Sequence, residues 1–409
     1  MPLDDARPVV RFLLLTLLTN AISFGIIIPV TPDLVQELGH VNLSTATAIG
    51  GQLALTYAGF QFFFSPIMGN LSDRFGRRPV LLLAMFGLAI EFIVMAFAPD
   101  LLWLFIARAL SGISGASNAP AQSSIADIVK PEQRTRMFGL LSAAFGVGFV
   151  IGPAIGGALG QIDLRLPFFV AALLAAINLV YGLVVGQETL KPENRRMFEW
   201  RRANALGSLL QVRRLPGILP IACVYFLWQV ASLVYPLLWN YFTAARWGWS
   251  PGLIGASLAV VGLFMAMTNI VINPRISPRL GERKTALLGM ACGAIGMFAY
   301  AFAPDGWMGF AIGPFMALQS LTHPALTAMM SRRARVDNQG EVQGFASSVM
   351  GLGALTAPLL LSPTQAWFTS GAAPFFFDGA AMFLAGCIAL GAMTLLWLIG
   401  EQEKGQALT

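Results

Sequence analysis

The chain of 409 residues is 56% hydrophobic and only 11% charged, and its 26 Lys and Arg exceed its 20 Asp and Glu. Soluble domains carry about 25% charged residues, so this composition excludes a soluble globular protein and predicts a polytopic membrane protein. Loops beside anionic lipid explain the excess of positive charge better than nucleic-acid binding, because no basic stripe follows a soluble face.

Twelve apolar runs follow one another along the chain, and each is close to the roughly 20 residues with which a helix crosses a bilayer core. They predict an all-α fold of 12 transmembrane helices. No small-residue cleavage site follows the first run, so we expect a retained helix and not a signal peptide. The three cysteines lie within runs, where we expect small core residues and no disulfide framework. The runs are 12–30, 49–68, 80–98, 101–126, 137–160, 167–186, 217–242, 253–272, 285–303, 307–330, 342–361 and 375–399.

The positive charges alternate from loop to loop. If both termini are cytoplasmic, the cytoplasmic segments hold 23 of the 26 Lys and Arg, the external loops hold Arg165 and Arg246, and Arg108 falls inside a run. Short loops rich in Lys and Arg stay on the cytoplasmic side. The sequence therefore predicts cytoplasmic termini.

The longest connector, residues 188–215, is rich in positive charge and divides the chain into residues 1–187 and 216–409, with six runs each. An internal repeat with an offset of 205 residues supports this division. Six helices separate the copies, which therefore have the same orientation in the membrane, as in a parallel repeat. Arg74, Gly76 and Arg78 recur as Arg279, Gly281 and Arg283, and Gly139, Gly146, Gly148 and Pro153 recur as Gly344, Gly351, Gly353 and Pro358.

A short loop between the second and third runs, residues 69–79, is dense in charge and in turn-forming residues. Gly76 permits a turn without side-chain strain. Arg77 or Arg78 could pair with Asp127, which ends the fourth run on the same side of the membrane. Such contacts would latch the halves of the protein together in one state and break in another. The alternative is a solvated loop whose arginines only set the topology.

The fifth run repeats small residues at close spacing, in Gly148, Gly152, Gly156 and Gly157. Small residues four apart allow a neighbouring helix backbone to approach closely. Pro153 removes an intrahelical hydrogen bond and favours a bend. The spacing predicts a close helix contact, which either opens and closes during function or packs permanently.

The whole chain resembles a twelve-helix transporter of the major facilitator superfamily. The loop residues resemble the signature between helices 2 and 3 of that family, and the glycines around Pro153 resemble its antiporter motif. Within the superfamily the closest likeness is to the tetracycline-type drug efflux proteins. The residues that carry this second likeness are 72–80, Gln61, Gln229, Arg246, Gly248, Trp249, Pro324, Ala325 and Leu326.

The resemblance implies a monomeric protein of the bacterial cytoplasmic membrane that exchanges a small molecule for protons, contacts lipid and needs no cofactor. It also implies that Asp73 lies near the positive N-terminal end of the eleventh helix, which begins near Gly340. The candidate gating residues are Gly69, Asp73, Arg74, Gly76, Arg77, Arg78, Asp127, Gly148, Gly152, Pro153, Gly156 and Gly157.

Two ionisable residues stand inside apolar runs at matching depth. Glu91 and Arg108 lie eight to nine residues from the external turn Pro99-Asp100, so at 1.5 Å per residue both stand roughly 13 Å inside that surface. Ionisable residues at this depth are costly and usually functional. A carboxylate balanced between the cost of burial and the attraction of an arginine is a candidate proton carrier. The alternatives are a static ion pair or a glutamate whose charge reaches outward.

Polar side chains form helical stripes on the first, fourth, seventh and tenth runs. In the superfamily these four helices line the central cavity, so the stripes are the expected substrate site. His323 can titrate near neutral pH and joins Glu91 and Arg108 as a proton-coupling candidate, although a packing histidine is the alternative. The candidate substrate-binding residues are Asn20, Phe24, Ser111, Asn118, Tyr225, Trp228, Gln229, Gln319 and His323.

The sequence departs from the tetracycline exporters at charged positions. Those proteins carry acidic residues in helices 1, 3 and 9, where this chain has Asn20, Glu91 and Gly293. A cationic metal–drug chelate would lose two of its counter-charges here. The resemblance therefore fixes neither tetracycline as the substrate nor the number of protons exchanged.

We expect a proton-coupled antiporter that exports an amphipathic small molecule by alternating access. The second hypothesis is an uptake carrier or proton symporter for a metabolite, such as an organic anion attracted by Arg108 and His323. The third is an embedded enzyme or a lipid-handling protein, which the sequence disfavours because it shows no phosphate-binding loop, paired carboxylates or metal-ligand cluster. We therefore expect neither enzymatic activity nor a bound metal.

Overall fold

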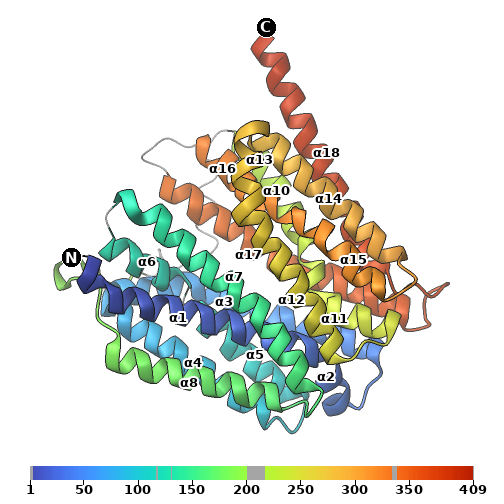
Figure 1. The fold of residues 1–409 in the computed structure, drawn as a ribbon, viewed down its shortest axis with the longest axis horizontal. Coiled ribbons are helices and arrows are strands. Elements are labelled where there is room, and N and C mark those ends of the chain that lie inside the picture. Colours follow the sequence, from blue (N-terminus) through green and yellow to red (C-terminus); the bar gives the residue numbers. More distant parts are fainter. Residues whose placement is uncertain (1–2, 117, 130, 200–216, 334–338, 409) are drawn as a thin grey trace. The chain divides into compact units, whose positions relative to one another are not determined.

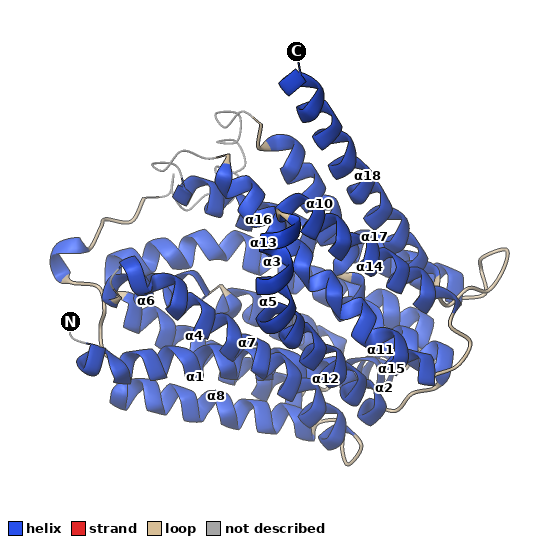
Figure 2. Cartoon of the chain, turned by 45° about the horizontal axis from the view of Figure 1, so that its top comes forward, coloured by secondary structure: helices blue, strands red, loops and turns tan. Residues whose placement is uncertain are grey.

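The computed structural model describes residues 3–116, 118–129, 131–199, 217–333 and 339–408. Throughout these ranges the chain forms helices and connecting loops without a strand (Figure 2). The expected all-α fold is confirmed. By length and composition, eight helical segments of the described chain can cross a membrane, and the helices of the second, fourth, fifth and tenth runs complete the predicted twelve.

The helical segments follow the order of the predicted runs (Figure 1). Those built from the first six runs are α1 Leu3–Ile27, the 3₁₀ helix η1 Ile28–Val30, α2 Thr31–Gly39, α3 Leu43–Phe75, α4 Arg77–Ala96, α5 Leu101–Gly115, α6 Asn118–Ile128, α7 Pro131–Gly160 and α8 Leu166–Val185. A short 3₁₀ helix, η2 Pro192–Asn194, lies in the connector. Those built from the last six runs are α10 Leu219–Ser232, α11 Val234–Trp247, α12 Pro251–Met267, the π-helical η4 Thr268–Ile272, α13 Asn273–Leu280, α14 Glu282–Phe302, α15 Trp307–Met316, the 3₁₀ helix η5 Ala317–Leu321, α16 Thr322–Arg332, α17 Gln339–Thr369 and α18 Ala380–Leu408.

The start of the last run was predicted too early. The hydropathy pattern begins it at Phe375, but α18 begins at Ala380 and the preceding phenylalanines lie in an exposed loop. Turn residues bracket this loop, with Pro374 before it and Asp378-Gly379 after it. Hydropathy alone misassigned the segment because the phenylalanines outweigh these turn signals.

The helices of the four runs with a polar stripe are interrupted, directly between α5 and α6 and between α10 and α11, and by a 3₁₀ helix between α1 and α2 (η1) and between α15 and α16 (η5). A proline in the first turn of each second piece explains the breaks, because it lacks an N–H donor and its ring crowds the carbonyl group four residues earlier. The breaks also follow the repeat, since Leu233 stands 205 residues after Ile28, and Leu321 stands 205 residues after Ala116. The prolines are Pro32, Pro120, Pro236 and Pro324.

The chain divides into two compact units. The first takes its described residues from 1–41, 56–205 and 250–259, and the second from 42–55, 206–249 and 260–409. The beginning of α3 thus belongs to the second unit, and the beginning of α12 belongs to the first. The division of the sequence at residues 187 and 216 stays a prediction about the membrane halves.

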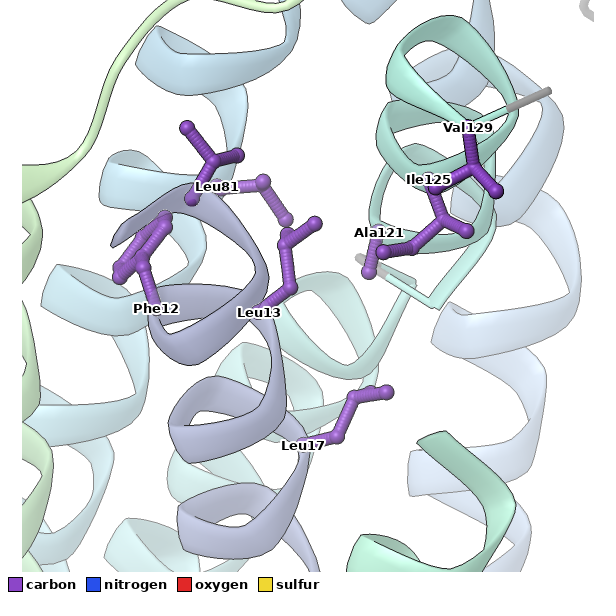
Figure 3. Close-up of a cluster of buried hydrophobic side chains, with 8 residues drawn as sticks. Phe12, Leu13, Leu17, Leu81, Ala121, Ile125 and Val129 are labelled. Carbon is purple, nitrogen blue, oxygen red and sulfur yellow. The ribbon is translucent and has the colours of Figure 1, made fainter. Parts of the chain in front are cut away.

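One end of the first unit is held by a buried apolar cluster in which α1, α4 and α6 meet (Figure 3). Phe12 and Leu13 of α1 pack with Leu81 of α4, and Ile125 extends the cluster onto α6. This packing fixes α6 beside the beginning of α4. It therefore places Asp127, near the end of α6, within reach of the charged loop that precedes α4.

Candidate functional site

The ionisable pair predicted at membrane depth is formed within the first unit. α4 and α5 pack as antiparallel neighbours, and Asp100 caps the start of α5 by accepting a hydrogen bond from the Leu102 N–H at 2.9 Å. This arrangement brings Glu91 and Arg108 face to face, and Arg108 Nη2 donates to Glu91 Oε1. The Glu91 side chain is fully buried. The two residues therefore meet inside the protein, and the carboxylate does not reach an outer surface.

This ion pair leaves hydrogen-bonding capacity unused. Arg108 Nη2 also contacts the Met95 sulfur at 3.0 Å, and the Ser111 side chain approaches Glu91. Glu91 Oε2 and Arg108 Nε have no described hydrogen-bond partner within bonding distance. A carboxylate buried without its full set of donors is costly, and binding a proton removes that cost. The geometry thus gives Glu91 one oxygen that can accept a proton.

Two polar residues of α3 that sequence reasoning left out of the site stand beside this pair. Gln61 Nε2 donates to the Tyr57 hydroxyl at 2.9 Å and to the Gly115 carbonyl at 3.3 Å, and Tyr57 lies within electrostatic range of Glu91 and Arg108. Their spacing of four residues inside an apolar run is the signal that could have revealed them. They connect the charge pair to the break between α5 and α6.

Several predicted substrate-binding residues lie around Tyr57. The Phe24 ring of α1 packs against the Tyr57 ring at a tilt of 44°, with centroids 6.0 Å apart, and Asn20 stands one helical turn before Phe24 on α1. Ser111 is buried one turn after Arg108. The side chain of Asn118 lies outside the described part of the structure, and its role stays a prediction.

The second unit brings together the predicted residues of the seventh and tenth runs. The Tyr225 and His323 rings meet edge to face with centroids 5.4 Å apart. Trp228 is fully buried, and Gln229 packs against Gly353, where a Cβ would lie 2.5 Å from the Gln229 Cγ. α10, α16 and α17 thus share one packed region.

Six buried polar atoms of this region have no hydrogen-bond partner within the described chain. A buried polar group that stays unpaired costs about 1–3 kcal/mol, so polar partners that reached these two segments would be bound favourably. The role of these residues in substrate binding stays a prediction. The atoms are Trp228 Nε1, Gln229 Oε1, Gln319 Oε1, Ser320 Oγ, Thr322 Oγ1 and His323 Nδ1.

At the charged loop, Arg77 and not Arg78 forms the ion pair with Asp127. Arg77 Nε donates to Asp127 Oδ2 at 3.0 Å, while its Nη1 donates to Asp73 Oδ1 at 2.5 Å and to Ser72 Oγ at 3.0 Å. The Arg77 side chain is buried, although a solvated loop would expose it. We call Asp73, Arg77 and Asp127 the arginine latch. All three lie in the first unit, and whether their contacts open during function stays a prediction.

The other arginines of the loop have separate partners. Arg78 Nη2 donates to the Leu183 carbonyl at 2.7 Å, and the exposed Arg74 lies over the Phe75 ring at 4.9 Å. The approach of Asp73 to the eleventh helix stays a prediction. A Cβ placed on Gly69 would have no described atom within 4 Å. Packing against the described residues therefore does not require glycine at this position.

Sequence reasoning missed Glu188, at the start of the connector. Glu188 Oε1 accepts from the Arg77 N–H at 2.8 Å and Oε2 accepts from the Arg78 N–H at 3.2 Å, so this carboxylate caps the beginning of α4. The Asp73 carbonyl also accepts from the Arg196 N–H at 3.0 Å. The sequence could not reveal the cap, because 110 residues separate its partners and one glutamate in a charged connector is not distinctive.

We expect Arg77→Gln to lower the melting temperature of the purified protein and to slow transport by about tenfold. The change removes hydrogen bonds to two carboxylates, and hydrogen bonds to charged groups contribute about 1.5–3 kcal/mol each when they are sheltered. Thermal unfolding in detergent and transport in proteoliposomes measure the two effects. Arg74→Gln is the matched control, and an equal effect of both changes would contradict a special role for the arginine latch.

The glycines of the fifth run make the close contact that their spacing predicts, within the first unit. α7 packs along α1 (Figure 1), and each successive glycine on this face lies against a backbone carbonyl. A Cβ placed on Gly148, Gly152 and Gly156 would meet in turn the carbonyl oxygens of Leu18, Ile22 and Ile26.

α7 makes a second close contact, with the beginning of α12. A Cβ on Gly157 would lie 2.5 Å from the Pro251 carbonyl oxygen and 3.1 Å from the Gly255 Cα. The Pro153 carbonyl in turn lies against Gly255. Two faces of α7 are therefore packed backbone to backbone, and whether either contact opens during function stays a prediction.

Comparison with known proteins identifies relatives across nearly the whole chain. The sequence matches the Major Facilitator Superfamily over residues 13–358 and 221–407. It is 40% identical to the class C tetracycline resistance protein of Escherichia coli over 351 residues, and this aligned region covers 86% of this chain and 88% of that protein. It is 37% identical to the class G tetracycline resistance protein of Vibrio anguillarum over 347 residues, and this aligned region covers 83% of this chain and 86% of that protein.

Comparison with solved structures identifies proteins whose fold is similar to that of this chain. The crystal structure of a D-xylose–proton symporter has a TM-score of 0.78 at 16% identity, and the match covers 95% of this chain and 97% of that chain. The crystal structure of the human organic anion transporter MFSD10 has a TM-score of 0.71 at 23% identity, and the match covers 95% of this chain and 99% of that chain. At these identities the likeness concerns the fold and not the substrate.

Proposed function

Because the chain belongs to the major facilitator superfamily and buries a carboxylate beside an arginine, we propose that it is a proton-coupled antiporter that exports an amphipathic small molecule by alternating access. The tetracycline resistance proteins to which it is 32–40% identical support export. The observation that carries the proton coupling is the Glu91–Arg108 pair.

The geometry supports coupling through competition for Glu91. When Glu91 is ionised, Arg108 neutralises it and the pair is closed. When Oε2 takes up a proton, the attraction to Arg108 weakens, and the guanidinium becomes available to other acceptors. A substrate that favours one of these states shifts the protonation of Glu91, and by linkage the proton shifts substrate affinity equally. One proton that moves inward down 100 mV supplies about 2.3 kcal/mol for this exchange.

Proton release tests this proposal directly. Purified protein in detergent is titrated at weakly buffered pH with a panel of amphipathic drugs and metabolites, and pH and binding are recorded together. We expect binding of a substrate to release protons. Binding without proton release would contradict antiport and would indicate a facilitator or coupling to another ion.

The second unit supports a substrate that is amphipathic and not a metal chelate. Gly293 stands at the position aligned with an acidic residue in the tetracycline exporters, and it faces the Trp228 ring. A Cβ on Gly293 would lie 2.6 Å from Trp228 Cη2 and 3.2 Å from Gln319 Cβ. The indole occupies the space that a carboxylate would need. Aromatic and amide groups here suit a ligand with an apolar face and a few polar groups.

We expect Gly293→Asp to lower the melting temperature without a gain in transport of the Mg²⁺–tetracycline chelate. The new carboxylate would overlap Trp228 and would lie buried without a partner, which is costly. Thermal unfolding and chelate uptake into everted vesicles check the two parts. Trp228→Ala in the same background removes the overlap and should recover part of the melting temperature. A Gly293→Asp protein that is as stable as the wild type and transports the chelate would contradict this account.

The alternative is a symporter or uptake carrier for an organic anion. Its strongest support is the unused hydrogen-bonding capacity of Arg108 Nε and His323 Nδ1. Glu91 already neutralises Arg108, however, which weakens the attraction of that site for an anion. Transport in oriented vesicles with an imposed pH gradient separates the two functions, because the substrate moves against the proton in antiport and with it in symport.

The charge distribution supports an orientation with both termini in the cytoplasm. We propose a monomer in the bacterial cytoplasmic membrane, as the relatives from Escherichia coli suggest. The two repeats would then move relative to one another around a central site, as in other transporters built from repeats.

A further inference from the structure

A pocket of about 530 Å³ lies in the second unit, where the loop before α14 and the first turns of α14 meet the end of α16 and the middle of α18 at Trp397. Four cations line it, Arg283, Lys284, Arg332 and Arg333, against the single carboxylate of Glu282. Glu282 accepts from Arg332 Nε at 2.8 Å, so it neutralises one of the four charges. The described residues that line the pocket therefore carry more positive than negative charge, and its volume suits a small ligand.

The same pocket has an apolar side. Leu287 and Met329 line it together with Trp397, and the Trp397 side chain is 53% exposed. Trp397 stands near the end of the apolar part of α18, which is where tryptophan gathers at membrane–water interfaces. A basic group of residues that adjoins an exposed interfacial tryptophan fits a ligand with an anionic head and apolar chains.

The internal repeat provides a comparison for the head of this ligand. In the first unit the Glu188 carboxylate caps the beginning of α4 and lies against Gly76. Gly281 is the equivalent of Gly76, but nothing described lies within 4 Å of a Cβ on Gly281. Among the described residues of the second unit, none fills the place beside the cations that an anion of the protein itself fills in the first unit.

The cations are not all committed to the protein. Arg283 Nη2 donates to the Trp397 carbonyl at 2.5 Å, which holds the guanidinium at the pocket wall, but its buried Nε has no hydrogen-bond partner among the described residues. Arg333 Nη1 donates to the Gly217 carbonyl at 2.8 Å. An anion in the pocket would supply acceptors for the exposed Lys284 ammonium group.

We propose that this pocket binds the phosphate of an anionic phospholipid, with the acyl chains along Leu287, Met329 and Trp397. The lipid would lie in the same leaflet as the repeated basic loops, because the pocket includes the second copy of that loop. None of the residues that line this pocket is among the candidate proton-coupling or substrate-binding residues. The proposal does not depend on which substrate the protein carries or in which direction.

Native mass spectrometry of the detergent-solubilised protein tests the proposal. The protein is titrated with phosphatidylglycerol and, separately, with phosphatidylcholine, whose headgroup carries a positive charge beside its phosphate. We expect one phosphatidylglycerol to bind at least tenfold more tightly than phosphatidylcholine. Lys284→Gln with Arg332→Gln should reduce phosphatidylglycerol affinity by about tenfold, or about 1.4 kcal/mol.

Arg275→Gln with Arg279→Gln is the matched control, since it removes the same charge from exposed positions on α13 that do not line the pocket. An equal loss in this control, equal binding of the two lipids, or unchanged binding in the Lys284 and Arg332 variant would overturn the proposal. Glycerol phosphate is the last competitor. If it displaces the lipid at equal concentration, the pocket binds a soluble phosphate and the assignment of a lipid is wrong.

Discussion

Replacing Glu91 with glutamine is expected to abolish transport driven by a pH gradient and to remove its pH dependence, with a loss of at least a hundredfold in the initial rate. Glutamine keeps the size of the side chain and can still contact Arg108, but it cannot take up or release a proton. Exchange of labelled for unlabelled substrate at equal pH should continue in this variant. Proteoliposomes with an imposed pH gradient measure the first process, and counterflow measures the second.

The Glu91→Gln change has a second consequence, which the experiment must separate from coupling. It leaves Arg108 buried without a counter-charge, and the loss of one partner of a buried ion pair costs about 3–5 kcal/mol of stability. The double variant Glu91→Gln with Arg108→Gln removes the isolated charge and should recover much of the melting temperature. Its proton-driven transport should remain absent if Glu91 is the proton carrier.

Glu37→Gln provides a matched control in the same unit. Glu37 also pairs with an arginine, since Arg165 Nη2 donates to its carboxylate at 3.3 Å, but half of its side chain is exposed. The same chemical change there should leave transport within about twofold of the wild type, because exposed ion pairs contribute little. Transport by Glu91→Gln that kept its rate and pH dependence would show that the pair is static.

The sequence alone predicted features that depend on local spacing. The equal distance of Glu91 and Arg108 from one turn indicated their depth, and the short connection between their helices made them neighbours. The four-residue spacing of Gly148, Gly152 and Gly156 indicated a close backbone contact in the same way. Such patterns are carried by helix geometry, which the sequence encodes directly.

Features that depend on distant parts of the chain were out of reach. Glu188 caps a helix that begins 111 residues earlier, and Trp228 fills the space beside Gly293 from a different helix. Packing decides both contacts, and neither residue stands in a distinctive local pattern. The expected approach of Asp73 to the eleventh helix has the same character, since it joins segments far apart in the sequence.

The contact between α1 and α7 yields the second prediction with a large expected effect, Gly152→Ala. The added methyl group would lie 2.6 Å from the Ile22 carbonyl oxygen and 3.0 Å from the Gly25 Cα. Both neighbours are backbone atoms, so no side chain can rotate away and the helices must separate. We expect a destabilisation of about 1–3 kcal/mol, as for other overpacked sites, and transport at least tenfold slower.

Gly146→Ala is the control, because it lies on the same helix with nothing described within 4 Å of its Cβ. Alanine favours helix over glycine by about 0.5–1 kcal/mol, so this change should raise the melting temperature slightly and leave transport unaltered. The two substitutions are chemically identical, and the expected shifts in melting temperature have opposite signs. If Gly152→Ala were also neutral, α1 and α7 could not be packed as closely as the structure places them. If it lowered transport without lowering stability, the close contact would be needed in a state of the transport cycle other than the most stable one, as expected of a contact that opens and closes.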